Sequence, residues 1–197
     1  VFEDNQCVIE QREVGLDTPS FHAALKHVLR QDPDIIMIGE MRDAISFGAA
    51  MSAADTGHLV VSTLHTTNAP QSITRILDFF KADEREQVRR QLAGTLQAVI
   101  CQRMVPTIQG GMTVAMEVLI NNPTVRKILE ENRLDKLGPA IETGQDEGML
   151  NFNQALFQLV KDGKITQKDA LAKASNPQAL EMYFQGIMLS EGKRILG

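Results

Sequence analysis

A glutamate and an arginine follow directly after a short apolar run in the first quarter of the chain. The run covers residues 35–38, Gly39 ends it, and Glu40 and Arg42 come next. Such a run is typical of a strand buried on both faces of a parallel sheet, and ligands bind at the carboxyl ends of these strands. A carboxylate at that edge can orient Mg²⁺ through water or polarise the water that attacks a γ-phosphate. Arg42 can hold a phosphate or a neighbouring carboxylate.

Two histidines bracket the next apolar run. His58 begins the stretch of residues 58–64, and His65 follows it. If the two runs form parallel strands, His65 lies on the same edge as Glu40, where an imidazole can sense the γ-phosphate or donate to a phosphate oxygen. Plainer roles stay open. A histidine at a strand end is commonly a satisfied structural residue, and Glu40 can form an ordinary salt bridge.

The elements that position these residues follow an α/β order. A short strand is expected at Cys7–Gln11, and Thr18 with Pro19 predicts the start of a helix, with Thr18 as its N-cap. Asp43 is the expected cap of a helix over residues 44–54. Strand, helix and strand in this order predict a right-handed crossover within a parallel sheet.

The middle of the chain predicts two helices and a hairpin. The helices are expected at residues 71–79 and 83–102, and the hairpin strands at 104–108 and 113–120, on either side of Gly110 and Gly111. The arginines of the second helix, Arg85, Arg89 and Arg90, are expected on a solvated face. They could instead face a neighbouring subunit.

Every segment after Asn122 reads as helical. The expected helices cover residues 123–131, 134–143, 152–161, 167–173 and 177–184. Asn122 and Asn176 are each followed by proline, which favours them as N-caps. We therefore expect an α/β core over residues 1–121 and a small all-helical domain over residues 122–197.

Composition narrows the class of protein. The 197 residues are 43% hydrophobic and 23% charged, with a net charge of -5, which is ordinary for a soluble globular protein and unlike a sequence-independent nucleic-acid binder. The two cysteines form no metal pair and fit a reducing cytoplasm. No apolar run reaches the length of a membrane span. Because the chain opens at Val1 in strand-like sequence, we expect it to be part of a longer protein.

Two long motifs carry a resemblance to a known family. Residues 32–43, DPDIIMIGEMRD, resemble the Walker B region of the secretion ATPases, and residues 56–68, TGHLVVSTLHTTN, resemble their histidine box. Residues 124–131, TVRKILEE, are similar to the AIRNLIRE helix of PilT-type ATPases. The zinc-binding cysteines usual in type II secretion ATPases are absent from this sequence. The chain thus most resembles the PilT/PilU-type pilus-retraction ATPases of the type II/IV secretion ATPase family.

The resemblance implies a fold and a catalytic site. It implies part of a RecA-like P-loop NTPase core followed by a helical domain, in a motor that uses ATP and Mg²⁺. Glu40 would activate the attacking water and hold Mg²⁺ through water. His58 and His65 would lie near the nucleotide and the subunit interface, and Arg42 would organise the site. The phosphate-binding loop, GxxxxGK followed by Ser or Thr, is not present and is expected upstream of Val1, so this chain alone would turn over little ATP.

The resemblance also implies an assembly and partners. The motor would be a homo-hexamer that retracts type IV pili, with Arg126 and Glu131 in the retraction motif. It would work in the cytoplasm, peripheral to the membrane, against the platform protein at the inner-membrane face, with no nucleic acid as partner. Glu130 stands where an arginine is usual, which leaves an accessory PilU-like motor open. A type II secretion or conjugation-type ATPase also stays open, as does a noncatalytic oligomerisation module.

Overall fold

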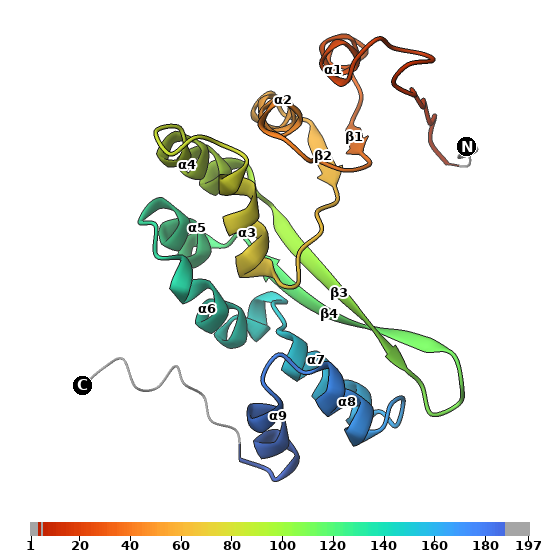
Figure 1. The fold of residues 1–197 in the computed structure, drawn as a ribbon, viewed down its shortest axis with the longest axis vertical. Coiled ribbons are helices and arrows are strands. Elements are labelled where there is room, and N and C mark those ends of the chain that lie inside the picture. Colours follow the sequence, from red (N-terminus) through yellow and green to blue (C-terminus); the bar gives the residue numbers. More distant parts are fainter. Residues whose placement is uncertain (1–3, 5, 188–197) are drawn as a thin grey trace. The chain divides into compact units, whose positions relative to one another are not determined.

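The computed structural model describes residue 4 and residues 6–187, and divides into two compact units, Val1–Leu64 and His65–Gly197. The first unit holds helix α1 (Phe21–Val28), strand β1 (Ile35–Ile38), helix α2 (Ala44–Asp55) and strand β2 (Leu59–Ser62). Strands β1 and β2 are parallel, with Ile36 opposite Val60. The predicted strand–helix–strand unit is confirmed (Figure 1).

The core of the first unit lies on one face of its two strands. Ile36 and Ile38 point into a cluster with Leu25, Ala50 and Ala53, which come from the two helices. The alternate residues of β1 face away from the cluster: Ile35 is 61% exposed and Met37 65%. The prediction of a strand buried on both faces is therefore wrong for these residues, because successive strand side chains point to opposite faces and α1 and α2 cover only one.

Two local predictions at the start of the chain are also wrong. Residues 7–11 form no strand, because the described chain offers them no ladder of backbone hydrogen bonds. The N-cap of α1 is Ser20, whose hydroxyl accepts the Ala23 N–H at 3.1 Å. Thr18 is buried instead, and its hydroxyl donates to the Ser20 carbonyl.

The second unit is built around a long hairpin. Helices α3 (Ala69–Asp78) and α4 (Arg85–Thr95) lead into strands β3 (Ala98–Pro106) and β4 (Met112–Ile120), which pair antiparallel from Ala98–Ile120 to Pro106–Met112. Gly110 and Gly111 in the turn have φ of +88° and +87°, a region that glycine enters without strain. The hairpin is confirmed, but the helix expected over residues 83–102 is too long. It ends at Thr95 because residues 98–102 belong to the ladder, whose cross-strand bonds outweigh local helix propensity.

The rest of the second unit is helical. Its helices are α5 (Pro123–Glu130), α6 (Leu137–Thr143), α7 (Phe152–Lys161), α8 (Gln167–Lys173) and α9 (Pro177–Phe184), with short 3₁₀ turns at Leu134–Lys136 and Gln145–Glu147. Asn122 and Asn176 cap α5 and α9 as predicted. No helix among the described residues has both the length and the apolar character needed to cross a membrane.

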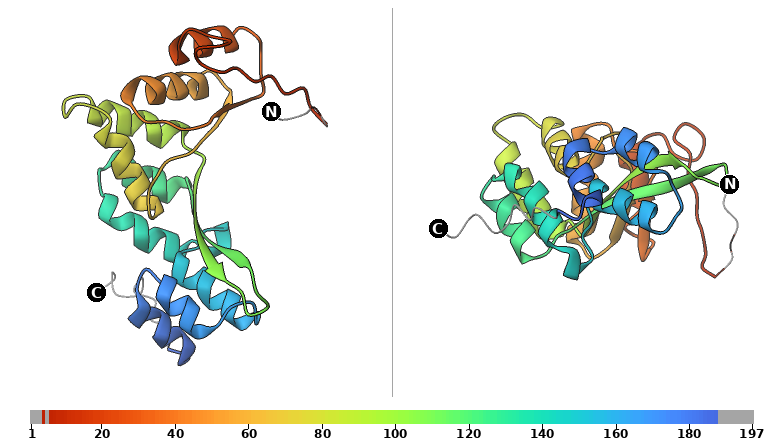
Figure 2. Two further views of the ribbon diagram at one scale, coloured as in Figure 1. Left: turned by 45° about the vertical axis from the view of Figure 1, so that its right-hand side comes forward. Right: turned by 90° about the horizontal axis from the view of Figure 1, so that it is seen from below.

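Helices cover one side of the hairpin and leave the other open. In Figure 2 the helices of this unit gather along one side of β3 and β4. On the opposite face the apolar side chains of Ile100, Met104 and Met116 are 60%, 50% and 43% exposed. Because the hairpin and the helices after it pack within one unit, the boundary at Asn121 stays a prediction.

Candidate functional site

The carboxyl ends of the two parallel strands are tied together. After β1 the chain continues through Gly39, Glu40 and Met41, and the Thr63 hydroxyl, just after β2, donates to the Gly39 carbonyl at 2.5 Å. The Met41 N–H donates to the Thr63 carbonyl at 3.4 Å. The turn that carries Glu40 is therefore held by the next strand, at the edge where open α/β sheets bind ligands.

Glu40 and Arg42 form a charged pair at this edge. An Arg42 Nη2 hydrogen donates to Glu40 Oε2, with the nitrogen and oxygen 2.5 Å apart. The Glu40 side chain is 24% exposed and that of Arg42 77%. The hydrogen bond to Glu40 and its negative charge raise the pKa of Arg42. The pair presents an acid that solvent or a ligand can reach and a cation that can turn toward an anion.

Helix α2 begins immediately beyond the pair. Asp43 caps it as predicted, accepting the Ser46 N–H at 2.7 Å and the Ser46 hydroxyl at 2.8 Å. These hydrogen bonds lower the pKa of Asp43. The cap fixes the carboxyl side of the turn, so that the loop carrying Glu40 and Arg42 is anchored at both ends.

His58 lies at the other end of the strands. It precedes β2, and its Nδ1 is 3.1 Å from both the Ala53 carbonyl oxygen and the Thr56 hydroxyl at the end of α2. Glu40 follows the carboxyl end of β1, and β1 and β2 are parallel. At a rise of roughly 3.3 Å per residue, the strand separates the two positions by well over roughly 10 Å. The structure thus does not bring His58 to Glu40, and its bonds are those of a residue that closes a helix end.

His65 opens the second unit and is exposed. The polar residues after it are firmly held: the Thr66 and Ser72 hydroxyls are 2.6 Å apart, and the Thr67 N–H and hydroxyl both donate to Gln71 Oε1. Asn68 caps α3 by accepting the Gln71 N–H at 2.8 Å. His65 therefore leads into a rigid, capped helix start.

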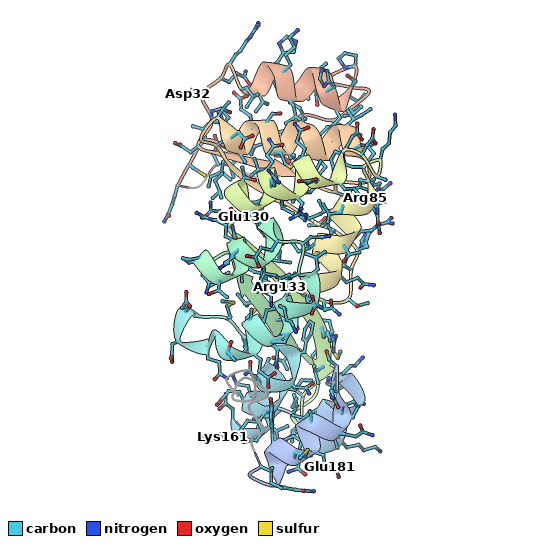
Figure 3. All side chains as sticks on the ribbon, turned by 90° about the vertical axis from the view of Figure 1, so that its left-hand side faces the viewer. Asp32, Arg85, Glu130, Arg133, Lys161 and Glu181 are labelled. Atoms are coloured by element: carbon cyan, nitrogen blue, oxygen red, sulfur yellow. The ribbon has the colours of Figure 1, made fainter. Side chains whose placement is uncertain are left out.

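Arg126 lies in the middle of α5, and Glu131 is its C-cap residue. Arg126 is exposed, whereas Val125, Ile128 and Leu129 face the core. Glu131 is 3.3 Å from Arg133 and 3.8 Å from Lys127. Figure 3 labels Glu130 at the end of the same helix and Arg133 just beyond it. This end of α5 carries charges of both signs.

Sequence reasoning missed the role of Arg89. It is only 8% exposed, and its guanidinium donates to the Leu129 and Glu130 carbonyls at the end of α5. The expectation of a solvated face holds for Arg85 and Arg90 and is wrong for Arg89. A signal was present, because Arg89 shares the helical stripe of Val88, Leu92 and Ala93, which are all buried.

A family model described as type II/IV secretion system protein matches residues 3–139. The chain belongs to this family. It is 43% identical to the type IV pilus ATPase PilU of Pseudomonas aeruginosa over 92% of its length, and 43% identical to the type IV pilus retraction ATPase PilT of the same organism over 90%. It spans about half of these relatives, 48% and 52% of their lengths.

The family fold is also found among solved structures. A crystal structure of the pilus retraction motor PilT with bound ADP matches with a TM-score of 0.82 and 43% identity, over 92% of this chain and 51% of that one. The α/β fold is thus that of part of a RecA-like secretion ATPase core, with a partial sheet and a helical C-terminal region. In this secretion-ATPase chain Glu40 lies at the carboxyl edge of β1 and β2. His65 and the α5 residues Arg126 and Glu131 lie in the second unit.

Proposed function

We propose that the full-length protein is an ATPase whose turnover drives type IV pilus retraction and twitching motility. The observation that carries the proposal is the 43% identity to PilU and PilT over 92% and 90% of the chain. The position of Glu40 at the carboxyl edge of two parallel strands supports it. Because the chain spans only half of these relatives, the activity belongs to the parent protein.

Glu40 and Arg42 fit the part of a nucleotide site that supplies the catalytic carboxylate. When bound, ATP with Mg²⁺ supplies the γ-phosphoryl group that water attacks. The Glu40 carboxylate would accept a proton from that water and would hold Mg²⁺ through water. Arg42 pairs with Glu40 and can move to a phosphate oxygen as charge develops. The backbone cradle for the phosphates must come from residues outside this chain, which lacks the phosphate-binding loop sequence.

The remaining assignments complete the proposal. His65 responds to the γ-phosphate, while His58 supports the end of α2 at the opposite end of the strands from Glu40. Arg126 and Glu131 contact the platform protein of the pilus machine at the cytoplasmic face of the inner membrane. The motor is a homo-hexamer. Glu130 favours an accessory PilU-like role as the second candidate, since it places a negative charge where retraction motors usually carry a positive one.

Substitution of Glu40 tests the proposal directly. We expect Glu40→Gln in the full-length protein to lower kcat by about 10²-fold or more, the usual contribution of a general base, with ATP still bound. Glu86→Gln is the matched control, because Glu86 is an exposed acid that also pairs with an arginine, Arg90. ATP turnover by wild type, both variants and the 197-residue chain is the measurement.

The outcomes separate the candidate functions. Wild-type turnover with an inactive Glu40→Gln supports the motor and the role of Glu40. Turnover by Glu40→Gln at the wild-type rate would make Glu40 structural. A parent protein that neither binds nor hydrolyses ATP would instead be a noncatalytic oligomerisation module.

A further inference from the structure

Two charged side chains stand side by side on the helix-covered face of the hairpin. Cys101 pairs with Glu117 and Arg103 with Ala115 across the ladder, so Arg103 and Glu117 project from the same face in adjacent pairs. Glu117 is 6% exposed. Charged residues are rarely buried this deeply unless they are paired, and the half-buried Arg103 is the neighbouring cation.

Arg103 joins three parts of the second unit. Its guanidinium donates to the Thr67 carbonyl at 3.2 Å and to the Lys173 carbonyl at 2.7 Å. Its Cζ lies 3.7 Å from the centre of the Phe152 ring. Lys173 is the last residue of α8, where carbonyls lack helical partners and a cation is favoured. Arg103 thus connects the segment after His65 to both α7 and α8.

Glu117 makes the complementary connection. Its Oε1 accepts the Ala69 N–H at 2.8 Å, and the Phe152 N–H also donates to this carboxylate. Ala69 and Phe152 are the first residues of α3 and α7. Helix starts present unpaired N–H groups and favour an anion, so one carboxylate satisfies two helices that are far apart in the sequence.

Arg103 and Glu117 therefore both hold the segment of residues 67–69. Residues 67–69 bond to Arg103 at Thr67 and to Glu117 at Ala69, and each of these side chains also bonds to the C-terminal helices. The segment is stiff in itself, because Thr67 and Asn68 both bond to Gln71. A displacement of residues 67–69 cannot be absorbed locally without breaking these bonds.

We infer that Arg103 and Glu117 are positioning residues that transmit movement of the segment after His65 to helices α7 and α8. The inference rests on the proposed function, in which His65 responds to the nucleotide. Nucleotide-dependent displacement of residues 65–69 then shifts the end of α8 through Arg103 and the start of α7 through Glu117. Neither side chain is required to touch the nucleotide.

The planar guanidinium is the feature to test. Arg103→Gln removes the charge and the paired donors, and Arg103→Lys keeps the charge but cannot span two carbonyls with one planar group. Arg75→Gln is the matched control, since Arg75 also lies over a phenyl ring, 5.2 Å from the centre of Phe79, but within α3 and its C-cap. All are made in the full-length protein.

Hydrogen–deuterium exchange with and without a non-hydrolysable ATP analogue and Mg²⁺ is the measurement. In wild type we expect the analogue to change exchange in α7 and α8. Arg103→Gln should abolish that change in α8 and reduce it in α7, where the Glu117 connection remains, while the analogue still binds because Arg103 is not required to touch it. Arg103→Lys should weaken the change, and Arg75→Gln should leave it intact.

Other results would overturn the inference. The inference would be wrong if the analogue changed hydrogen–deuterium exchange in α7 and α8 as much in both Arg103 variants as in wild type. If Arg103→Gln does not fold, Arg103→Lys is measured alone, and an exchange change of wild-type size in that variant contradicts the inference. A wild-type protein that binds the analogue without any response in α7 and α8 also contradicts the inference, whereas one that does not bind it contradicts the proposed function instead.

Discussion

At the scale of single residues, the two acids that matter most are stabilised by different means. Glu40 lies at a strand edge with an exposed arginine as partner. Glu117 lies inside the second unit, where burial raises its pKa and the Ala69 N–H and the charge of Arg103 lower it, with a net rise above the ordinary 4.5. Glu40 lies where a ligand can reach it, whereas Glu117 joins the starts of two helices.

The raised pKa of Glu117 predicts a pH dependence of stability. The folded state binds this proton more tightly than the unfolded chain, so the contribution of Glu117 is largest below about pH 4.5 and falls as pH rises through the folded pKa. The melting temperature of wild type should therefore fall relative to that of Glu117→Gln, whose side chain stays neutral, as pH rises above about 4.5. Thermal unfolding of the full-length proteins across this range is the measurement.

A variant that cannot titrate provides the comparison. Gln154 completes the capping box of α7 by accepting the Asn151 N–H, so Gln154→Ala should lower the melting temperature by an amount that varies little with pH. A wild type that becomes more stable relative to Glu117→Gln as pH rises would show that ionised Glu117 is the favoured folded form, against the expectation.

At the scale of elements, α5 is fixed at both ends. Asn122 accepts the Val125 N–H at its start, and Arg89 of α4 donates to the Leu129 and Glu130 carbonyls at its end. The cation therefore adds a charged donor to the last carbonyls and lies at the negative end of the helix. The orientation of the exposed face with Arg126 depends on this contact.

Arg89→Met should loosen α5 selectively. Losing hydrogen bonds from a charged donor costs about 1.5–3 kcal/mol, whereas Arg90→Met, on the exposed side of α4, should stay within about 0.5 kcal/mol. Denaturant unfolding gives the free energies, and hydrogen exchange of the α5 amides localises the effect. Equal losses in the two variants, or faster exchange spread evenly over the unit, would mean that Arg89 does not act through α5.

The sequence predicts elements well where their ends carry local signals. Asp43, Asn122 and Asn176 sit at helix starts as expected, because an N-cap bonds within three residues of itself. The start of strand β3 could not be predicted, because residues 98–102 are strand only through pairing with the far end of β4, residues 116–120. The carboxyl-edge position of Glu40 followed from the order of elements alone.

The contacts of Arg89, Arg103 and Glu117 could not be predicted in the same way. Arg103 bonds to residues 36 and 70 positions away, and Glu117 to one 48 positions away. No periodicity or spacing encodes such distances, since they depend on how several helices pack on the hairpin. For Arg89 the stripe of apolar neighbours indicates the burial but not the carbonyls it meets.

At the scale of the whole molecule, both units leave one sheet face uncovered. In the first unit Ile35, Met37, Leu59 and Val61 are 61%, 65%, 46% and 45% exposed, and in the second the hairpin exposes Ile100, Met104 and Met116. Contiguous apolar faces of this kind mark surfaces that meet other protein. Since the chain spans half of its pilus relatives, we expect the rest of the parent protein to cover them.

A lysine on the open face of the hairpin tests whether that face is covered in the full-length protein but not in the 197-residue chain. In the 197-residue chain Met104 is half exposed, so Met104→Lys should change the free energy of unfolding by no more than about 0.5 kcal/mol. In the full-length protein the same lysine would be buried without a partner, at a cost of about 3–5 kcal/mol. Thr74→Lys, on the exposed side of α3, should be tolerated in both proteins.

If Met104→Lys is equally mild in both proteins, the open face is not covered within one subunit. Its partner would then be another chain, which the dependence of stability on protein concentration would reveal.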